Sequence, residues 1–217
     1  MTAPEVELRT AWQRLAGPGR SEPFDALLAR LREPHRQYHT ASHVMWVLRH
    51  AEAILAEADD LHLDGDAVRL AALWHDAVYD TSASDNEAAS ARLAHDVAMQ
   101  LGWPVERADL VEELVASTAP GWHRPAPRRP AGLIDEFDVL HDADLAILGS
   151  EPAAYQAYVN GVRREYAHVD DGAWRTGRSA VLRSLLATDP LYRTPAFDTR
   201  TARARANLTA ELAALNP

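Results

Sequence analysis

The most informative stretch of this chain is Ala71-Ala72-Leu73-Trp74-His75-Asp76-Ala77-Val78-Tyr79-Asp80. It indicates both a buried helix and a polar site at the end of that helix. Four apolar residues precede His75 and Asp76, and further apolar residues follow them, which is typical of the end of a buried helix. A polar pair that leaves a buried face needs partners, and a cation satisfies both groups at once. The same dipeptide at His95-Asp96 has Arg92 one turn away, which favours a solvated helix face.

Apolar residues recur at intervals of three and four along nearly the whole chain, from Val44, Val47 and Leu48 onward. Similar stripes predict helices over residues 5–16, 22–32, 66–79, 86–101, 105–117, 133–148, 151–168, 172–187 and 199–215. No sustained alternation predicts a strand. We therefore predict an all-α bundle of about ten helices in a single domain, residues 1–217. The four prolines of 120–130 predict a loop there, which we expect to serve as a lid over a site.

Composition excludes several functional classes. The 217 residues include 22 basic and 32 acidic side chains, and the formal charge of −10 opposes binding to nucleic acid or to an anionic membrane surface. No lysine or cysteine is present, which excludes a P-loop lysine, a Schiff base, a thiol nucleophile and cysteine-ligated zinc. The N-terminal residues are charged every few positions and no run is apolar enough to span a membrane, so we expect a cytoplasmic protein.

Two further segments offer ligands for a metal ion near His75-Asp76. His39 and His43 are four apart, which places them on one face if a helix has begun by His39. Asp142 and Asp144 are two apart and point about 200° from each other on a helix. The apolar stripe of 133–148 puts Asp144 on the core face and predicts that Asp142 points outward.

His43, His75, Asp76 and Asp144 form the predicted metal site, with ligands from three helices. Two imidazoles and two carboxylates leave coordination positions open on an ion that takes five or six ligands. Open positions are typical of a catalytic site rather than a closed structural one.

The pattern H…HD…D resembles the HD-domain superfamily of metal-dependent phosphohydrolases. More narrowly, the chain is similar to a family of small stand-alone predicted HD phosphohydrolases. The motifs that carry this likeness span nearly the whole chain: Arg36-Gln37-Tyr38-His39 with His43, Trp74-His75-Asp76-Ala77-Val78-Tyr79-Asp80, Asp85-Asn86-Glu87-Ala88-Ala89-Ser90-Ala91, Asp142-Ala143-Asp144-Leu145-Ala146-Ile147-Leu148-Gly149, Arg164-Glu165-Tyr166 and Ala204-Arg205-Ala206-Asn207-Leu208.

The resemblance implies an HD-like helical domain with a metal core at about 34–149 and C-terminal helices, 151–215, packed on it. It also implies that His43, His75, Asp76 and Asp144 hold one or two divalent ions, with Mn, Mg, Fe, Co, Ni and Zn all open. Relatives show a Thr and a His three apart before the loop, whereas Thr118 is followed here by Ala-Pro-Gly. His123 is therefore assigned no role.

The expected activity is hydrolysis of a small phosphorylated metabolite or nucleotide by a metal-activated water. Asp76 and Glu87 are the predicted catalytic residues, and Arg36 and His39 the predicted substrate-binding residues. The alternatives are an acid at a helix N-terminus for Glu87, a surface ion pair for Arg36, and a hydrogen-bonded histidine or a ligand of a second ion for His39. We expect a small phosphorylated molecule as substrate and no nucleic acid or membrane partner, and a homodimer is possible.

Two other functions stay open at this point. An HD-fold di-iron oxygenase would need more histidine ligands, for which 77–143 offers only His95, His123 and His141. A non-catalytic, metal-stabilised module that senses a nucleotide would keep the same ligand set. The sequence leaves the substrate, the physiological ion and the oligomeric state undetermined.

Overall fold

The computed structural model describes residues 1–58, 62–121 and 133–216, and their regular structure is entirely helical, which confirms the all-α prediction. The helices are α1 (Ala3–Ala16), α2 (Glu22–Leu31), α3 (Ala41–Glu57), α4 (Gly65–Trp74), α5 (Asn86–Gln100), α6 (Val105–Ala116), α7 (Glu136–Asp144), the 3-10 helix η1 (Leu145–Gly149), α8 (Pro152–Glu165), α9 (Asp171–Ala187), the 3-10 helix η2 (Pro195–Arg200) and α10 (Thr201–Leu215). Most of the predicted 120–130 loop, His123 included, lies outside the described residues.

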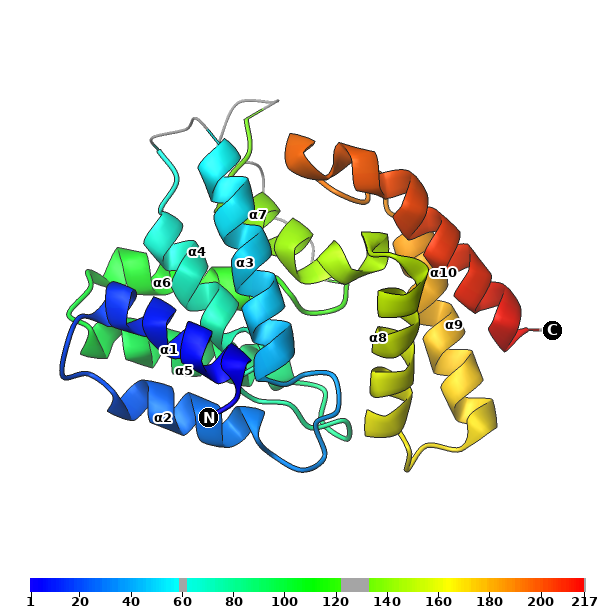
Figure 1. The fold of residues 1–217 in the computed structure, drawn as a ribbon, viewed down its shortest axis with the longest axis horizontal. Coiled ribbons are helices and arrows are strands. Elements are labelled where there is room, and N and C mark those ends of the chain that lie inside the picture. Colours follow the sequence, from blue (N-terminus) through cyan, green and yellow to red (C-terminus); the bar gives the residue numbers. More distant parts are fainter. Residues whose placement is uncertain (59–61, 122–132, 217) are drawn as a thin grey trace.

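Helices α3 and α7 lie between two groups of helices (Figure 1). On one side α3 packs against α1 and α4, and α4 packs in turn against α5 and α6. On the other side α8 and α10 pack against η1, which continues directly from α7, and α9 packs on α10. The α7–η1 segment therefore joins the N-terminal helices to the C-terminal ones.

Helix α4 ends at Trp74 instead of continuing to residue 79 as its apolar stripe predicts. The backbone groups that would extend the helix have other partners: the guanidinium of Arg36 binds the carbonyl oxygens of Asp76 (2.8 Å) and Ala77 (3.2 Å). The amide of Asp80 donates to the side chain of Asn86. Residues 75–80 are thereby held as a non-helical segment.

Helix α7 is shorter than the predicted 133–148. A capping box between Asp135 and Asp138 starts the helix at Glu136, and the backbone tightens into η1 after Asp144. Leu133, assigned by its spacing to the apolar stripe, precedes the helix and is 57% exposed.

The prediction that Asp142 points outward is wrong. Its side chain is fully buried and accepts hydrogen bonds from the backbone amides of Arg193 and Thr194 and from the Thr194 hydroxyl, at 2.7–3.0 Å. The segment before η2 covers the face of α7 that the apolar stripe predicted to be exposed. Asp142 therefore anchors that segment.

None of the helices in the described part of the chain combines the length and apolar character needed to cross a membrane.

The contrast between Leu140 and Leu133 gives a direct test of the packing around α7. Leu140 is fully buried, so Leu140→Ala is expected to lower the free energy of unfolding by about 2–5 kcal/mol, through lost apolar contact and the cavity left behind. Leu133→Ala removes the same atoms from an exposed position and is expected to cost less than about 0.5 kcal/mol. Urea denaturation followed by circular dichroism measures both, and equal losses would contradict this account of α7.

Candidate metal centre

The end of α4 brings His75 and Asp76 into the interior. Trp74 fixes this end, since its ring lies 5.1 Å from the ring of Trp12 on α1. His75 is 2% exposed, and its Nδ1 donates to the carbonyl oxygen of Ala72 at 2.9 Å. Because a carbonyl oxygen only accepts, Nδ1 carries a proton, and Nε2 of the neutral ring is free to bind a cation.

His43 approaches the same point from the first turn of α3. The helix begins after Thr40, whose hydroxyl caps it by accepting from the amide of Ser42. The Nε2 atoms of His43 and His75 are 3.1 Å apart, and both side chains are buried. Two ring nitrogens at this distance repel each other unless a proton or a cation lies between them.

Asp76 and Asp144 complete the cluster. Oδ2 of Asp76 lies 3.2 Å from Nε2 of His43 and 3.1 Å from Nε2 of His75. Oδ1 of Asp144, at the end of α7, lies 3.4 and 3.5 Å from the same two nitrogens. Bonds of about 2.1 Å to a central ion separate neighbouring ligand atoms by about 3.0 Å in an octahedron and about 3.4 Å in a tetrahedron. The four side chains expected from the sequence therefore meet at one point, and His43, His75 and Asp144 form a group able to hold a metal ion.

Unsatisfied polar atoms at this point also fit a cation. Oδ2 of Asp76 is buried and makes no hydrogen bond of regular geometry, although it faces both histidine rings. A buried carboxylate oxygen without a donor is costly and uncommon in folded proteins. A divalent ion among these atoms would satisfy Asp76 and separate the two imidazoles.

The four side chains of the cluster shift one another's pKa values even without an ion. Burial alone would lower the pKa of His43, but hydrogen bonding to Asp144 and Asp76 outweighs it and raises the pKa to about 9. Burial likewise opposes the charged form of His75, and the charge of Asp76 raises its pKa. Burial would raise the pKa values of the two carboxyls, yet the histidines hold both below their usual range.

Two tyrosines that the sequence analysis did not single out line the centre. The ring of Tyr38 lies 4.7 Å from the ring of His43, and the ring of Tyr158 on α8 lies 4.8 Å from Tyr38. Helix α8 approaches this closely because Gly161 faces Tyr38, where a Cβ would come within 3.0 Å of the tyrosine's own Cβ. These side chains make one wall of the site apolar.

Arg36 has neither of the roles considered for it. Its side chain is fully buried and donates to the backbone carbonyls of His39, Asp76 and Ala77 and to the carboxylate of Glu33. A guanidinium engaged in this way cannot also clamp a phosphate, and it is not a surface ion pair. Arg36 is an internal brace between the segment before α3 and the segment after α4.

His39 lies beside the centre but not on a helix, because α3 begins only at Ala41. Its ring stacks on Tyr79 at 4.1 Å and meets the ring of His43 edge-on at 5.5 Å. Glu87, in the first turn of α5, is half-buried and is not a member of the ligand group.

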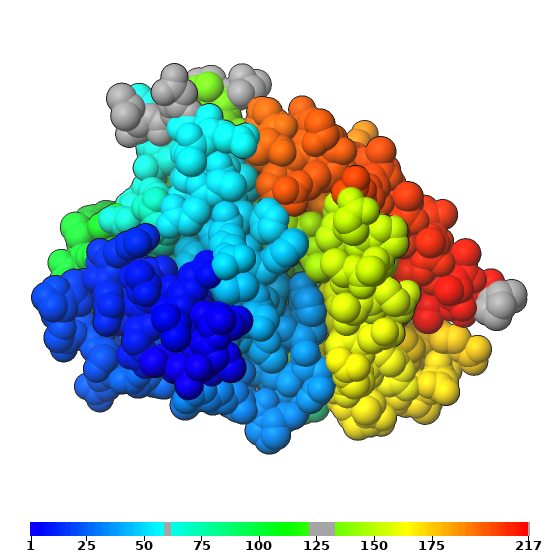
Figure 2. All heavy atoms as spheres, in the orientation of Figure 1, coloured from blue at the N-terminus to red at the C-terminus, as the bar shows by residue number. Residues whose placement is uncertain are grey.

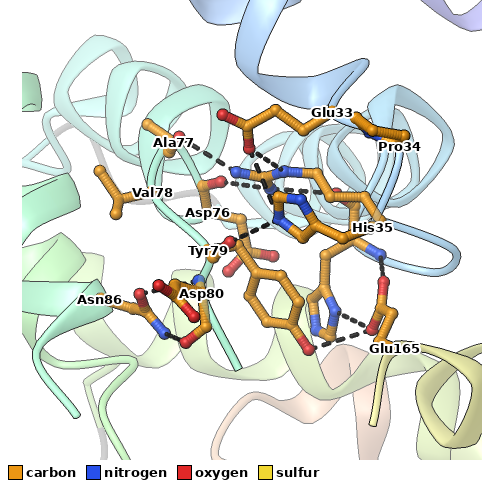
Figure 3. Close-up of polar contacts among 12 residues, drawn as sticks. Glu33, Pro34, His35, Asp76, Ala77, Val78, Tyr79, Asp80, Asn86 and Glu165 are labelled. Atoms are coloured by element: carbon orange, nitrogen blue, oxygen red, sulfur yellow. Dashed lines mark hydrogen bonds and ion pairs between the residues drawn. The ribbon is translucent and has the colours of Figure 1, made fainter. Parts of the chain in front are cut away.

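Glu165 is the residue that the spacing arguments missed. It is the last residue of α8 and its side chain is fully buried. Its Oε1 accepts from the backbone amides of Gln37, Tyr38 and His39 at 2.7, 2.7 and 3.0 Å. Its Oε2 accepts from Nδ1 of His39 (2.8 Å) and from the hydroxyl of Tyr79 (3.0 Å), and Figure 3 shows the Tyr79 hydroxyl pointing at it. Only the Arg164-Glu165-Tyr166 motif signalled this residue, without indicating a role.

Two other histidines considered as ligands, both in the described part of the chain, do not join the cluster. His95 faces Asp109 of α6, 3.4 Å away, and with Glu112 forms a separate, partly exposed group. His141 lies 4.0 Å from the carboxylate of Asp142 rather than at the centre.

Comparison of the chain with protein-family models, with curated proteins and with solved structures finds no match. The interpretation of the centre therefore depends on its own geometry and chemistry.

The raised pKa of His43 makes metal binding dependent on pH. At neutral pH this imidazole carries a proton that a cation must displace, so binding is expected to release about one proton. The apparent affinity for Mn²⁺ should rise by up to about tenfold per pH unit and level off as pH passes about 9, the pKa of His43. Titration calorimetry in two buffers of different ionisation enthalpy measures the proton count. An affinity unchanged between about pH 6 and 8 would contradict this assignment.

Proposed function

We propose that this protein is a metal-dependent phosphohydrolase acting on a small phosphorylated molecule. The observation that carries the proposal is the convergence of His43, His75, Asp76 and Asp144 at ligand distances in the interior. The resemblance of the H…HD…D pattern to the HD-domain superfamily supports the same activity. Mixed imidazole and carboxylate ligands suit Mn, Fe, Co, Ni or Zn, and we include Asp76 as the fourth ligand of the site.

An ion bound there would supply a water of lowered pKa and a Lewis acid for the phosphoryl oxygens. The chain's own contribution is to hold the four ligands in a fixed arrangement and to restrict water. Tyr38 and Tyr158 cover His43 on one side, which keeps the ligands in a low dielectric and strengthens their interactions with charge.

Glu87 is proposed as the residue that protonates the leaving group. It is half-buried in the first turn of α5, and its charge acts on Tyr166, whose pKa is raised mainly by burial and further by Glu165 and Glu87. Tyr166 directly follows Glu165, the residue that binds His39. The effect on Tyr166 thus relates Glu87 to the Glu165–His39 pair, although Glu87 is not one of the ligands.

His39 is the side chain proposed to meet the reacting group directly, because Arg36 is committed to backbone carbonyls. The imidazole is partly accessible, with 19% of the side chain exposed, and lies against His43. None of the described residues forms a hydrogen bond with its Nε2. That atom is free to bond to a substrate or to the attacking water.

Asp76→Ala is expected to abolish phosphate release and metal content together, because it removes a ligand that touches both imidazoles. Asp96→Ala is the matched control: it alters the His-Asp pair of α5, where the Asp96 side chain is 70% exposed, and it should change neither property. The measurements are metal analysis and a phosphate-release screen of nucleotides and sugar phosphates with Mn, Mg, Co and Ni.

The same screen separates the alternatives. Metal bound without turnover of any phosphate ester would favour the non-catalytic module, whereas iron-dependent oxygen uptake would favour the oxygenase. Activity that survives Asp76→Ala would show that the site is wrongly assigned.

Glu87→Gln tests the proton donor separately from the ligands. A glutamine cannot protonate a leaving group, so kcat should fall by about 100-fold or more while the metal content stays unchanged. Glu106→Gln is the control, since Glu106 holds the equivalent first-turn position of α6. If the two variants lose the same small fraction of activity, Glu87 is only a favourable charge at a helix N-terminus.

A further inference from the structure

Glu165 makes more hydrogen bonds than its place at the end of a helix explains. Its two oxygens accept five of them, three from successive backbone amides and two from side chains, while the carboxylate is fully buried. Hydrogen bonding to the charged form and the proximity of His39 outweigh the cost of burial and lower the pKa of Glu165 to about 2. The carboxylate is therefore ionised and can act only as an acceptor.

This fixes the proton on the ring of His39. An ionised carboxylate 2.8 Å from Nδ1 requires a proton on Nδ1. In the neutral imidazole the lone pair then lies on Nε2, the nitrogen for which the described residues supply no partner. The ring cannot turn freely, because it is stacked on Tyr79 and its own backbone amide is bound by the same carboxylate.

The fixed ring belongs to the metal centre. It meets the ring of His43, one of the proposed ligands, edge-on at 5.5 Å. In the neutral ring with its proton on Nδ1, Nε2 is a hydrogen-bond acceptor on the side chain beside that ligand.

We propose that Glu165 is a positioning residue that holds His39 with its Nε2 lone pair toward the centre, where it accepts a hydrogen bond from the attacking water. Glu165 acts through His39 and does not touch the substrate itself. The role given to the water depends on the proposed phosphohydrolase activity, but the orientation of the ring does not. The α8 helix then supplies a part of the site from far along the chain, and Figure 2 shows the segment before α3 in contact with α8.

Glu165→Gln is the test. A glutamine side chain can still accept from the three backbone amides, but its amide group donates toward Nδ1 of His39 and so favours the tautomer with the proton on Nε2. Nitrogen-15 NMR of the metal-free protein at about pH 8 should show His39 protonated on Nδ1 in the wild type and on Nε2 in the variant. His39→Gln identifies the resonance.

Turnover provides the second measurement. Glu165→Gln should lower kcat by about 10–100-fold with unchanged metal content, and His39→Gln should lower it as much. The double variant should be no worse than either single one, because both changes remove the same hydrogen bond. The control is Glu5→Gln, which alters another buried carboxylate, bound to Arg32 and to the amide of Thr2, without reaching the centre.

The outcomes can be told apart. A wild-type ring protonated on Nε2, or additive losses in the double variant, overturns the positioning role. If no phosphate ester is hydrolysed by the wild type, the proposed function fails, and the NMR result still decides the orientation of His39. If Glu165→Gln does not fold, the wild-type spectrum together with the turnover and metal content of His39→Gln decides instead.

Discussion

Two imidazoles and two carboxylates face one another in the interior of this protein, and much of the local structure exists to hold them there. Without an ion the arrangement is costly, since two ring nitrogens lie 3.1 Å apart and a buried oxygen of Asp76 has no regular donor. The histidines compensate only by taking up protons, which is why the pKa of His43 rises to about 9. A divalent cation would replace those protons and satisfy all four side chains. Without an ion the cluster therefore lowers the stability of the fold, whereas its geometry is already that of a group able to hold one.

The backbone around the centre raises a second problem, because the segments 33–40 and 75–80 are not helical and leave amide and carbonyl groups unpaired by helix bonds. Two buried charged side chains of opposite sign solve it. Arg36 donates to the carbonyls of both segments, and Glu165 accepts from the amides of residues 37–39. Buried backbone amides and carbonyls need hydrogen-bond partners, and each of these two charged side chains binds several of them at once. The irregular segments that carry His39, His75 and Asp76 are therefore as well fixed as the helices on either side.

The apolar spacing of the sequence predicted the all-α fold, and local patterns indicated the four side chains that meet at the centre. These patterns are a polar pair after a buried run, a carboxylate on the core face of a stripe, and two histidines four residues apart. What it could not predict depends on contacts between distant segments. Asp142 was placed on an outer face, yet the chain near residue 193 returns to cover it. The sequence predicts a phosphate clamp at Arg36, yet two of its acceptors are the backbone carbonyls of Asp76 and Ala77, 40 and 41 positions along the chain. The pattern of side chains along a sequence does not indicate which backbone carbonyls an arginine will bind. It likewise does not indicate which backbone amides Glu165 will bind.

The internal use of Arg36 changes how a phosphorylated substrate would have to be bound. The chain has no lysine and a formal charge of −10, and the centre itself contributes two carboxylates. Of the arginines described near the site, Arg36 is bound to carbonyl groups and Arg178 to the carboxylate of Glu211, so neither is free to attract a phosphate dianion. A bound divalent ion would neutralise Asp76 and Asp144 and would also be the main attraction for the substrate. On this argument substrate binding and nucleophile formation depend on the same ion, so loss of the ion should weaken both together, whereas loss of the Glu165–His39 contact should affect only the chemical step.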